Sequence, residues 1–200
     1  MKKITLIFLL YPLLVFGQGT SEEYINSGNA KSELKDYSGA IEDYSKAIEI
    51  DPKDADAYYN RGRIKEKLKD YSGAIEDYNK TIEINPKDVD AYYFRGSAKL
   101  NLGDFSGAIA DYSKAIKINP KDAELYYFRG SAKEELKDYS GAIEDYSKAI
   151  EINPKDAGYY YFRGFVKEDL KDFDGACKDY KKACDLGDQE GCLNYKEVCQ

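Results

Sequence analysis

The chain has 200 residues, with 37 acidic and 30 basic side chains, a formal net charge of −7 and no histidine. Phosphate backbones and anionic lipid surfaces repel an acidic chain, so nucleic acid and membrane surfaces are poor partners. The absence of histidine removes the commonest general base and the commonest metal ligand. We therefore expect no enzyme activity, no metal site and no cofactor.

The first 17 residues have the pattern of a secretory signal peptide. Lys2 and Lys3 precede an apolar run from Ile4 to Phe16, and Val15-Phe16-Gly17 precedes the expected cleavage. The run is shorter than the roughly 20 residues that a membrane-spanning helix needs. We expect an exported chain that begins near Gln18 and does not insert into a membrane after cleavage. It would be periplasmic in a Gram-negative bacterium, or secreted, and an uncleaved anchor is the alternative.

A phrase of about 34 residues recurs five times along the rest of the chain. Its centre reads Tyr-Ser-Gly-Ala-Ile-Glu-Asp-Tyr over residues 37–44, and it returns with few changes at 71–78, 105–112, 139–146 and 173–180. A fixed period of roughly 20 to 50 residues is typical of stacked arrays, in which each unit buries its apolar face against its neighbours. After a short segment at 18–20, we expect five units in one elongated domain, at residues 21–54, 55–88, 89–122, 123–156 and 157–190.

Each unit has the pattern of two helices. In the second unit, residues 55–69 place Tyr58, Gly62 and Leu68 at near-helical spacing, so we expect these three residues to lie on the buried side of the helix. Ser72 is a candidate N-cap for the second helix, and proline ends that helix at Asn85-Pro86. The apolar stripe of the second helix consists of Ala74, Ile75, Tyr78 and Ile82. Because the break between the two helices is short, they should pack as an antiparallel pair.

These units resemble tetratricopeptide repeats. That family's pattern has an aromatic residue, a glycine four residues later, and then alanine, an aromatic residue, alanine and proline. The matching residues are Tyr58, Gly62, Ala74, Tyr78, Thr81 and Pro86 in the second unit, and Tyr92, Gly96, Ala108, Tyr112, Ala115 and Pro120 in the third. The resemblance implies an all-α fold: a right-handed solenoid of five antiparallel helix pairs plus a short C-terminal capping helix.

Two features depart from the family pattern. Where the first helix usually has leucine and then an aromatic residue, this chain has an arginine and a lysine four residues apart, which share one helix face. Each second helix carries an aspartate just before its tyrosine. These residues are Arg61/Lys65, Arg95/Lys99, Arg129/Lys133 and Arg163/Lys167, with Asp43, Asp77, Asp111, Asp145 and Asp179. We hypothesise a ladder of ion pairs between the helices, with solvated cations at the edge as the alternative.

All four cysteines lie near the end of the chain, at Cys177, Cys184, Cys192 and Cys199. In an exported protein an even number of cysteines favours disulfides. Seven residues span about 10.5 Å of helix, so an antiparallel hairpin would pair Cys184 with Cys192 and Cys177 with Cys199. Zinc sites place cysteines closer together in sequence, and these spacings do not fit one. The segment from Ala183 to Cys192 also resembles the linker of Sel1-like repeat proteins of the exported bacterial type, which implies a bridge here. Residues 191–200 would complete the disulfide-linked capping helix.

The tetratricopeptide resemblance also implies a binding face. In that family the first helices line a concave groove, and side chains one, two and five positions after the first aromatic residue point into it. The candidate peptide-binding residues are therefore Tyr59, Asn60, Arg63, Tyr93, Phe94, Tyr127, Phe128, Tyr161, Phe162 and Phe165, with Ser97 and Ser131 beside them. Tyrosine combines apolar area with a hydrogen-bonding tip, which suits protein interfaces. Packing between neighbouring first helices is the alternative role for these rings.

The leading hypothesis is a non-enzymatic scaffold that binds an extended peptide or a partner helix in this groove. Acidic residues at its C-terminal part favour protein or peptide partners that are neutral to basic; these residues are Glu134, Glu135, Glu168 and Asp169. The alternative is a structural component or spacer of a cell-envelope assembly, which would act through repeat edges or self-association. The sequence leaves the oligomeric state open.

Overall fold

The computed structural model describes residues 19–199, and within that range the chain forms helices and no strands. The helices are α1 (Ser21–Glu33), α2 (Tyr37–Ile50), α3 (Ala55–Lys67), α4 (Tyr71–Ile84), α5 (Val89–Asn101), α6 (Phe105–Ile118), α7 (Ala123–Glu135), α8 (Tyr139–Ile152), α9 (Ala157–Asp169), α10 (Phe173–Asp185) and α11 (Gln189–Cys199). Across the described residues, every helix is too short or too polar to cross a bilayer. The signal peptide expected at residues 1–17 lies outside this range.

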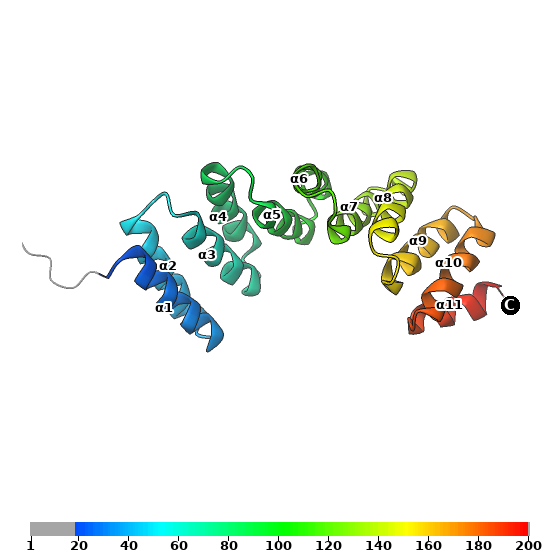
Figure 1. Ribbon diagram of the computed structural model, residues 1–200, viewed down its shortest axis with the longest axis horizontal. Helices are drawn as coiled ribbons and strands as arrows, with labels where there is room; N and C mark the ends of the chain where they lie inside the picture. Colours follow the sequence, from blue (N-terminus) through cyan, green and yellow to red (C-terminus); the bar gives the residue numbers. More distant parts are fainter. Residues whose placement is uncertain (1–18, 200) are drawn as a thin grey trace, which may run out of the picture.

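The helices stack as consecutive pairs along one long axis. Each odd-numbered helix packs against the even-numbered helix that follows it, and α11 packs on α10. Figure 1 shows the pairs forming an arch, with α4, α6 and α8 along its outer side. Helix α3 also contacts α1 and α5, so the first helices of successive repeats are neighbours on the inner side. The expected all-α solenoid of helix pairs with a C-terminal capping helix is confirmed.

Aspartate side chains cap the N-termini of the second helices in all five pairs. Asp70 accepts a hydrogen bond at 3.0 Å from the backbone N–H of Gly73, and its backbone carbonyl accepts from Ala74. The expectation that Ser72 caps this helix is wrong, because α4 already begins at Tyr71 and the carboxylate one residue earlier supplies the cap. The equivalent caps are Asp36, Asp104, Asp138 and Asp172.

The turn between paired helices explains a second correction. Leu68 was expected in the core, but it is the C-cap of α3 and 50% exposed. The chain leaves the helix there, and Lys69 takes a left-handed backbone conformation with φ of 63° to reverse direction. Leucine at this position therefore points away from the pair, whereas Gly62 is buried and Tyr58 is half-buried.

The core consists of tyrosine rings packed on small residues. Tyr78 is fully buried, as is Ala74 one turn earlier in α4. A Cβ added at Gly62 of α3 would lie 2.9 Å from the Tyr78 ring, so the close approach of the two helices requires glycine here. The corresponding tyrosines of the other second helices are at most 2% exposed and are Tyr44, Tyr112, Tyr146 and Tyr180.

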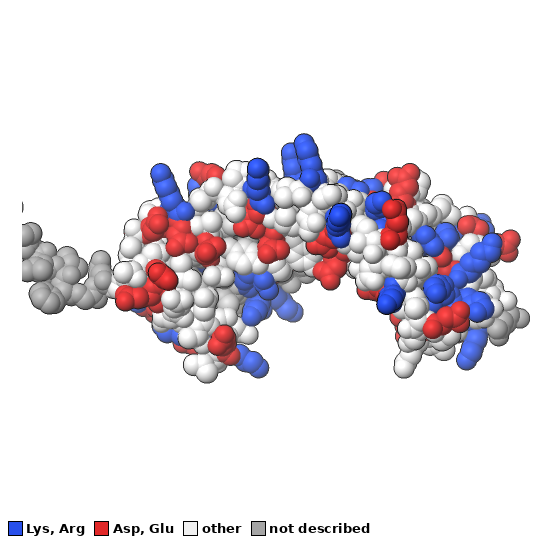
Figure 2. Space-filling view, viewed as in Figure 1, with Lys and Arg blue, Asp and Glu red and all other residues white. Residues whose placement is uncertain are grey.

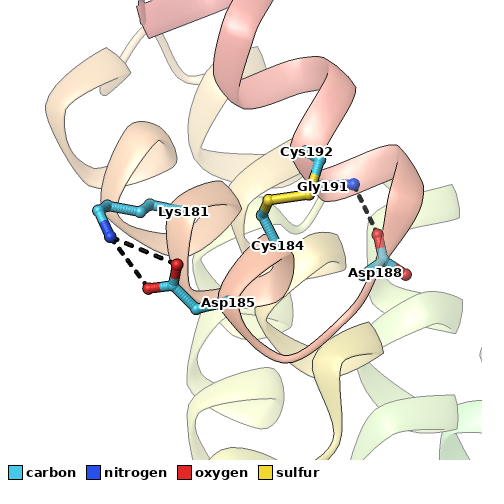
Figure 3. The surroundings of a disulfide bond; sticks show 6 residues. All are labelled: Lys181, Cys184, Asp185, Asp188, Gly191 and Cys192. Carbon is cyan, nitrogen blue, oxygen red and sulfur yellow. Dashed lines mark hydrogen bonds and ion pairs between the residues drawn. A yellow bond between two sulfur atoms is a disulfide. The ribbon is translucent and has the colours of Figure 1, made fainter.

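Two disulfides hold the capping helix α11 on α10. Cys177 pairs with Cys199 and Cys184 with Cys192, with Cα–Cα separations of 5.7 and 4.5 Å. This is the pairing that the sequence spacing favours. Figure 3 shows the second bridge beside the turn, where Asp188 accepts a hydrogen bond from the backbone N–H of Gly191. A disulfide stabilises by about 2–4 kcal/mol, which suits a terminal helix that has a neighbour on one side.

Candidate binding groove

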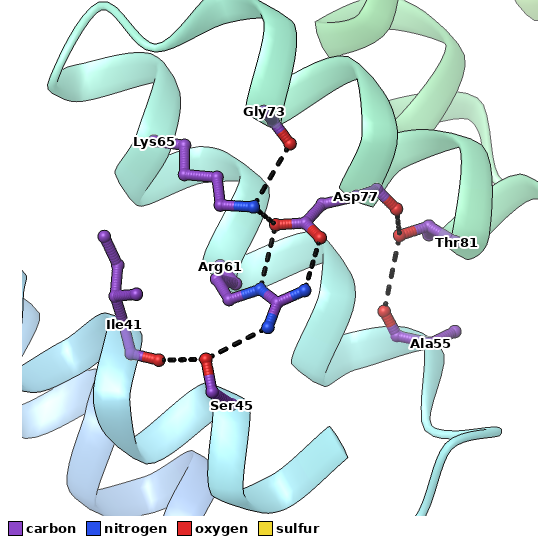
Figure 4. A network of polar contacts seen from close by, with 8 residues as sticks. All are labelled: Ile41, Ser45, Ala55, Arg61, Lys65, Gly73, Asp77 and Thr81. Carbon is purple, nitrogen blue, oxygen red and sulfur yellow. Dashed lines mark hydrogen bonds and ion pairs between the residues drawn. The ribbon is translucent and has the colours of Figure 1, made fainter. Parts of the chain in front are cut away.

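A ladder of ion pairs joins the first helices to the second helices along the chain. The Arg61 guanidinium donates to both carboxylate oxygens of Asp77, at 3.0 and 2.7 Å, and Lys65 Nζ lies 2.8 Å from the same carboxylate. Arg61 also donates to Ser45 Oγ at 3.0 Å, and Ser45 belongs to the preceding repeat (Figure 4). One arginine therefore links α2, α3 and α4.

The same arrangement recurs along the solenoid. The equivalent rungs are Arg95 and Lys99 on Asp111, Arg129 and Lys133 on Asp145, and Arg163 and Lys167 on Asp179. In the first repeat Ser27 replaces the arginine and donates to Asp43, which Lys31 also contacts. The five aspartates are 2–4% exposed. The hypothesis of an ion-pair ladder is confirmed: the aspartates are buried, and the arginines and lysines that contact them are partly exposed.

Burial of these carboxylates is offset by their partners. For Asp43, burial alone would raise the pKa, but the hydrogen bonds from Lys31 and Ser27 outweigh it and hold the pKa below its usual value. The hydrogen bond to Asp145, with its charge, raises the pKa of Arg129 although burial opposes this. Each rung is therefore a buried carboxylate paired with partly exposed cations, and removal of one partner would leave the others uncompensated.

The predicted groove residues form a row of aromatic rings on the inner helices. Three tyrosines of the row lie against the phenylalanine of the next first helix. The ring centroids are 5.9 Å apart for Tyr59 and Phe94, and 5.3 Å apart both for Tyr93 and Phe128 and for Tyr127 and Phe162. Phe128 in turn stacks on the buried Tyr112 at 5.9 Å. These rings therefore pack between neighbouring first helices, as the alternative interpretation proposed, and remain half-buried on the surface as well.

A pocket of about 410 Å³ opens in the middle of this row. Its walls come from α5, α7 and α9 and from the turn before α9. The lining residues are Tyr93, Glu124, Tyr127, Phe128, Asp156, Gly158, Tyr159 and Phe162. Four predicted groove residues meet here: Tyr93, Tyr127, Phe128 and Phe162.

Tyr159 and the two carboxylates of this pocket were not among the predicted residues. Tyr159 is 5% exposed, and burial, helped by nearby carboxylates, raises its pKa to about 12. One feature of the sequence indicated that Tyr159 is special: the equivalent positions in the three preceding repeats are Ala57, Ala91 and Leu125. A large ring at a position that is otherwise small or aliphatic marks the pocket.

The remaining predicted residues lie outside the central pocket. Asn60 and Arg63 line a smaller cavity of about 320 Å³ with Tyr59 near the N-terminal end. At the other end, Tyr161 packs on Tyr180 at 6.0 Å, and Phe165 is 40% exposed. The candidate residues therefore form a continuous row but not one single site.

Arg63 is placed unlike any other residue of the row. Its guanidinium carbon lies 3.7 Å from the centroid of the Phe94 ring, and it donates a 3.0 Å hydrogen bond to the Tyr59 hydroxyl. A cation over an aromatic face is attracted by the ring's electrons. In this part of the groove, the chain itself supplies the cation that covers the rings.

The buried tyrosines beneath the row differ in their hydroxyl partners. Tyr78 donates to Glu66 at 2.9 Å, and Tyr146 to Glu134 at 2.8 Å. Among the described residues the Tyr112 hydroxyl has no hydrogen-bond partner. Leu100 occupies the position equivalent to Glu66, which explains the missing acceptor.

Figure 2 shows acidic and basic side chains interspersed over the face viewed, with a hollow below the arch. No single sign of charge dominates that face.

Comparisons with known proteins agree with this architecture. Models described as tetratricopeptide repeat match residues 55–88, 93–157 and 157–186, and a model described as TPR repeat matches residues 28–69. The chain belongs to the tetratricopeptide repeat proteins. A comparison with curated proteins gives no match.

Solved structures of the same fold cover most of the chain. A crystal structure of MamA protein has a TM-score of 0.80 and 28% identity, covering 88% of this chain and 95% of that one. MamA 41-end from Desulfovibrio magneticus RS-1 has a TM-score of 0.79 and 22% identity, covering 83% and 94%. YrrB, described as a TPR protein with an unusual peptide-binding site, has a TM-score of 0.77 and 24% identity, covering 87% and 90%. The last two likenesses establish the fold alone.

Proposed function

We propose that this protein is a non-enzymatic scaffold that holds a segment of a partner protein along the aromatic row of its concave face. The pocket of about 410 Å³ between Tyr93 and Phe162 carries this proposal. Half-buried tyrosine and phenylalanine rings on three helices give apolar area and polar tips, the combination favoured at protein interfaces. Tetratricopeptide repeat proteins typically serve as protein-interaction scaffolds, which supports the same reading.

The occupant we propose is an extended peptide or one face of a partner helix, neutral to basic in charge. The pocket lining contains the carboxylates of Glu124 and Asp156 and, among the residues that the structure describes, no lysine or arginine. Because the rings are already packed against one another, little ordering cost falls on the scaffold when a segment binds.

We further propose that the protein acts outside the cytoplasm, in the periplasm or after secretion. The two disulfides of the capping helix support this location, because such bonds persist in oxidising compartments. The signal-peptide pattern of residues 1–17 points the same way. Detection of the processed chain in a periplasmic fraction would support it, whereas an unprocessed cytoplasmic chain would contradict it.

The central experiment compares capture of partners from periplasmic extract by matched triple variants. The test variant carries Tyr93→Ala, Tyr127→Ala and Tyr161→Ala in the groove. The control carries Tyr92→Ala, Tyr126→Ala and Tyr160→Ala, which are the preceding residues and lie beside the ladder arginines at 5.5 to 5.8 Å. Both must retain the helical circular dichroism of the parent protein.

We expect the control to retain the captured partner and the groove variant to lose it. Equal capture by both variants would contradict the groove proposal. It would favour the alternative function as a spacer that acts through repeat edges or self-association. Loss in both variants with retained helicity would also contradict it, because binding would then not be specific to the groove tyrosines.

A further inference from the structure

The protein contains an internal example of how its groove holds a cation. Arg63 of α3 lies 3.7 Å over Phe94 and donates to the Tyr59 hydroxyl, so a Tyr–Phe pair from adjacent first helices receives a guanidinium. Besides the cavity that it lines with Tyr59 and Asn60, Arg63 lines a second pocket of about 320 Å³ with Glu66, Lys67, Phe94 and Asn101. The cation and the ring pair thus form a complete unit in this part of the groove.

The next two Tyr–Phe pairs repeat the rings but not the cation. The ring centroids of Tyr93 and Phe128 are 5.3 Å apart, as are those of Tyr127 and Phe162. The corresponding distance between Tyr59 and Phe94 is 5.9 Å. The position of Arg63 is occupied by Ser97 in the third repeat and by Ser131 in the fourth. Neither serine carries a charge or reaches as far as arginine, so these pairs have no cation from the chain at that position.

The charges around the pair change sign along the solenoid. Near Phe94, Arg63 and Lys67 face the single carboxylate of Glu66. The residues equivalent to Arg63, Glu66, Lys67 and Asn101 two repeats later are Ser131, Glu134, Glu135 and Asp169. Two cations and one anion are thus replaced by three anions.

The fourth repeat shows the consequence of this change. Burial, with the nearby charges of Glu135 and Asp169, raises the pKa of Glu134, against the hydrogen bond that Tyr146 donates to it. On the pocket side, Tyr127 and Phe162 line the same cavity as Glu124 and Asp156. Carboxylates therefore flank a half-buried aromatic pair in which the position of Arg63 is taken by serine.

We propose that the Tyr127–Phe162 pair receives a lysine or arginine side chain of the partner, held as Arg63 is held by Tyr59 and Phe94. This proposal rests on the proposed function and names the chemistry of its central contact. The rings supply the cation–π attraction and apolar walls for the methylene stem. The surrounding carboxylates supply charge complementarity that an uncharged side chain would not use.

The test uses two small probes that differ in one charge. N-acetyl-arginine amide and its uncharged citrulline counterpart are titrated into the purified protein, with both disulfides intact, and the aromatic ring signals are followed by NMR. We expect the citrulline probe to bind at least tenfold more weakly. Saturable shifts should appear at the rings of Tyr127 and Phe162.

A variant with its own arginine beside the Tyr127–Phe162 pair tests whether the probe binds at that pair. Ser131→Arg places a guanidinium at the position of Arg63, and we expect it to weaken binding of the arginine probe at least tenfold. Ser106→Arg is the control, since it adds the same charge at an exposed residue of α6 and should leave binding unchanged. Equal binding of the two probes, or an unaltered affinity in Ser131→Arg, would overturn the proposal.

Failure of this inference can be told apart from failure of the proposed function. A partner lost from the groove tyrosine variant but retained by Ser131→Arg would leave the scaffold function standing and overturn the basic side chain as the central contact. A partner that both variants lose, while Ser106→Arg keeps it, would support both.

Discussion

The ladder between paired helices and the groove on the first helices are built from the same repeats, but their residues vary very differently along the chain. The ladder has arginine, lysine and aspartate at equivalent positions in repeats two to five. In the groove, the equivalents of Arg63 are Ser97, Ser131 and Phe165, and the equivalents of Lys67 are Asn101, Glu135 and Asp169.

The difference follows from where each side chain finds its partners. Each ladder residue finds its partner within the chain around a buried carboxylate, so changing one member leaves an uncompensated charge. A groove residue is partly exposed and packs on rings that stay in place when it changes. The groove can therefore differ from repeat to repeat without loss of the fold, which is what a binding surface requires.

The largest effect is expected from alkaline pH, which acts on the buried tyrosines of the core and of the groove. Burial, with nearby carboxylates, raises the pKa of Tyr93 and Tyr159 to about 12, and burial raises the pKa of Tyr78, Tyr112 and Tyr146 further. Unfolded tyrosine titrates near a pKa of about 10. Because the pKa of these tyrosines is higher in the folded state, their burial stabilises the fold fully below about pH 10. This stabilisation is lost as pH rises toward about 12.

We expect global unfolding in that range, seen as loss of circular dichroism together with a steep rise in tyrosinate absorbance. Complete tyrosine ionisation near pH 10 with helicity retained would contradict this prediction.

Breaking one rung should have the next largest effect. Asp111→Ala leaves Arg95 and Lys99 without their buried partner, and we expect the free energy of unfolding to fall by about 3–5 kcal/mol. Urea denaturation followed by circular dichroism measures this. Glu76→Ala removes an exposed carboxylate from α4 and should change stability by less than about 0.5 kcal/mol. A loss below 1 kcal/mol for Asp111→Ala would mean that the rungs contribute no more than surface pairs.

The sequence predicted what the period and helix geometry determine, and missed what depends on neighbouring repeats. Repetition predicted the helix pairs, and an arginine and an aspartate on facing helices predicted the ladder. Ser72 was misassigned because Asp70, just before the helix, can cap it as well as a serine can. Leu68 was misassigned because it is the C-cap residue, where the chain leaves the helix and the helical spacing no longer applies. The pocket of Tyr159 combines side chains of three helices, so no single repeat shows it.

The buried hydroxyls beneath the groove test how much a polar contact in the core contributes to the fold. Tyr146→Phe removes the 2.8 Å hydrogen bond to Glu134, and we expect a loss of about 1–2 kcal/mol. Tyr112→Phe removes a hydroxyl without a partner among the described residues, and should instead stabilise the protein by about 1 kcal/mol. Thermal unfolding of the two variants compares them directly. Equal losses would show that the Tyr112 hydroxyl has a partner in solution, such as water.

The smallest effect is expected where the groove supplies its own cation. Arg63→Ser copies the residue of the next two repeats and uncovers Phe94, and we expect a loss of about 0.5–1 kcal/mol because the guanidinium is partly exposed. Lys53→Ser removes the same charge from an exposed turn and should be neutral. Urea denaturation of both variants separates the ring contact from the change in net charge. A loss of 3 kcal/mol or more would place Arg63 with the ladder rather than with the groove, and would mean that Ser97 and Ser131 mark weakened repeats instead of open sites.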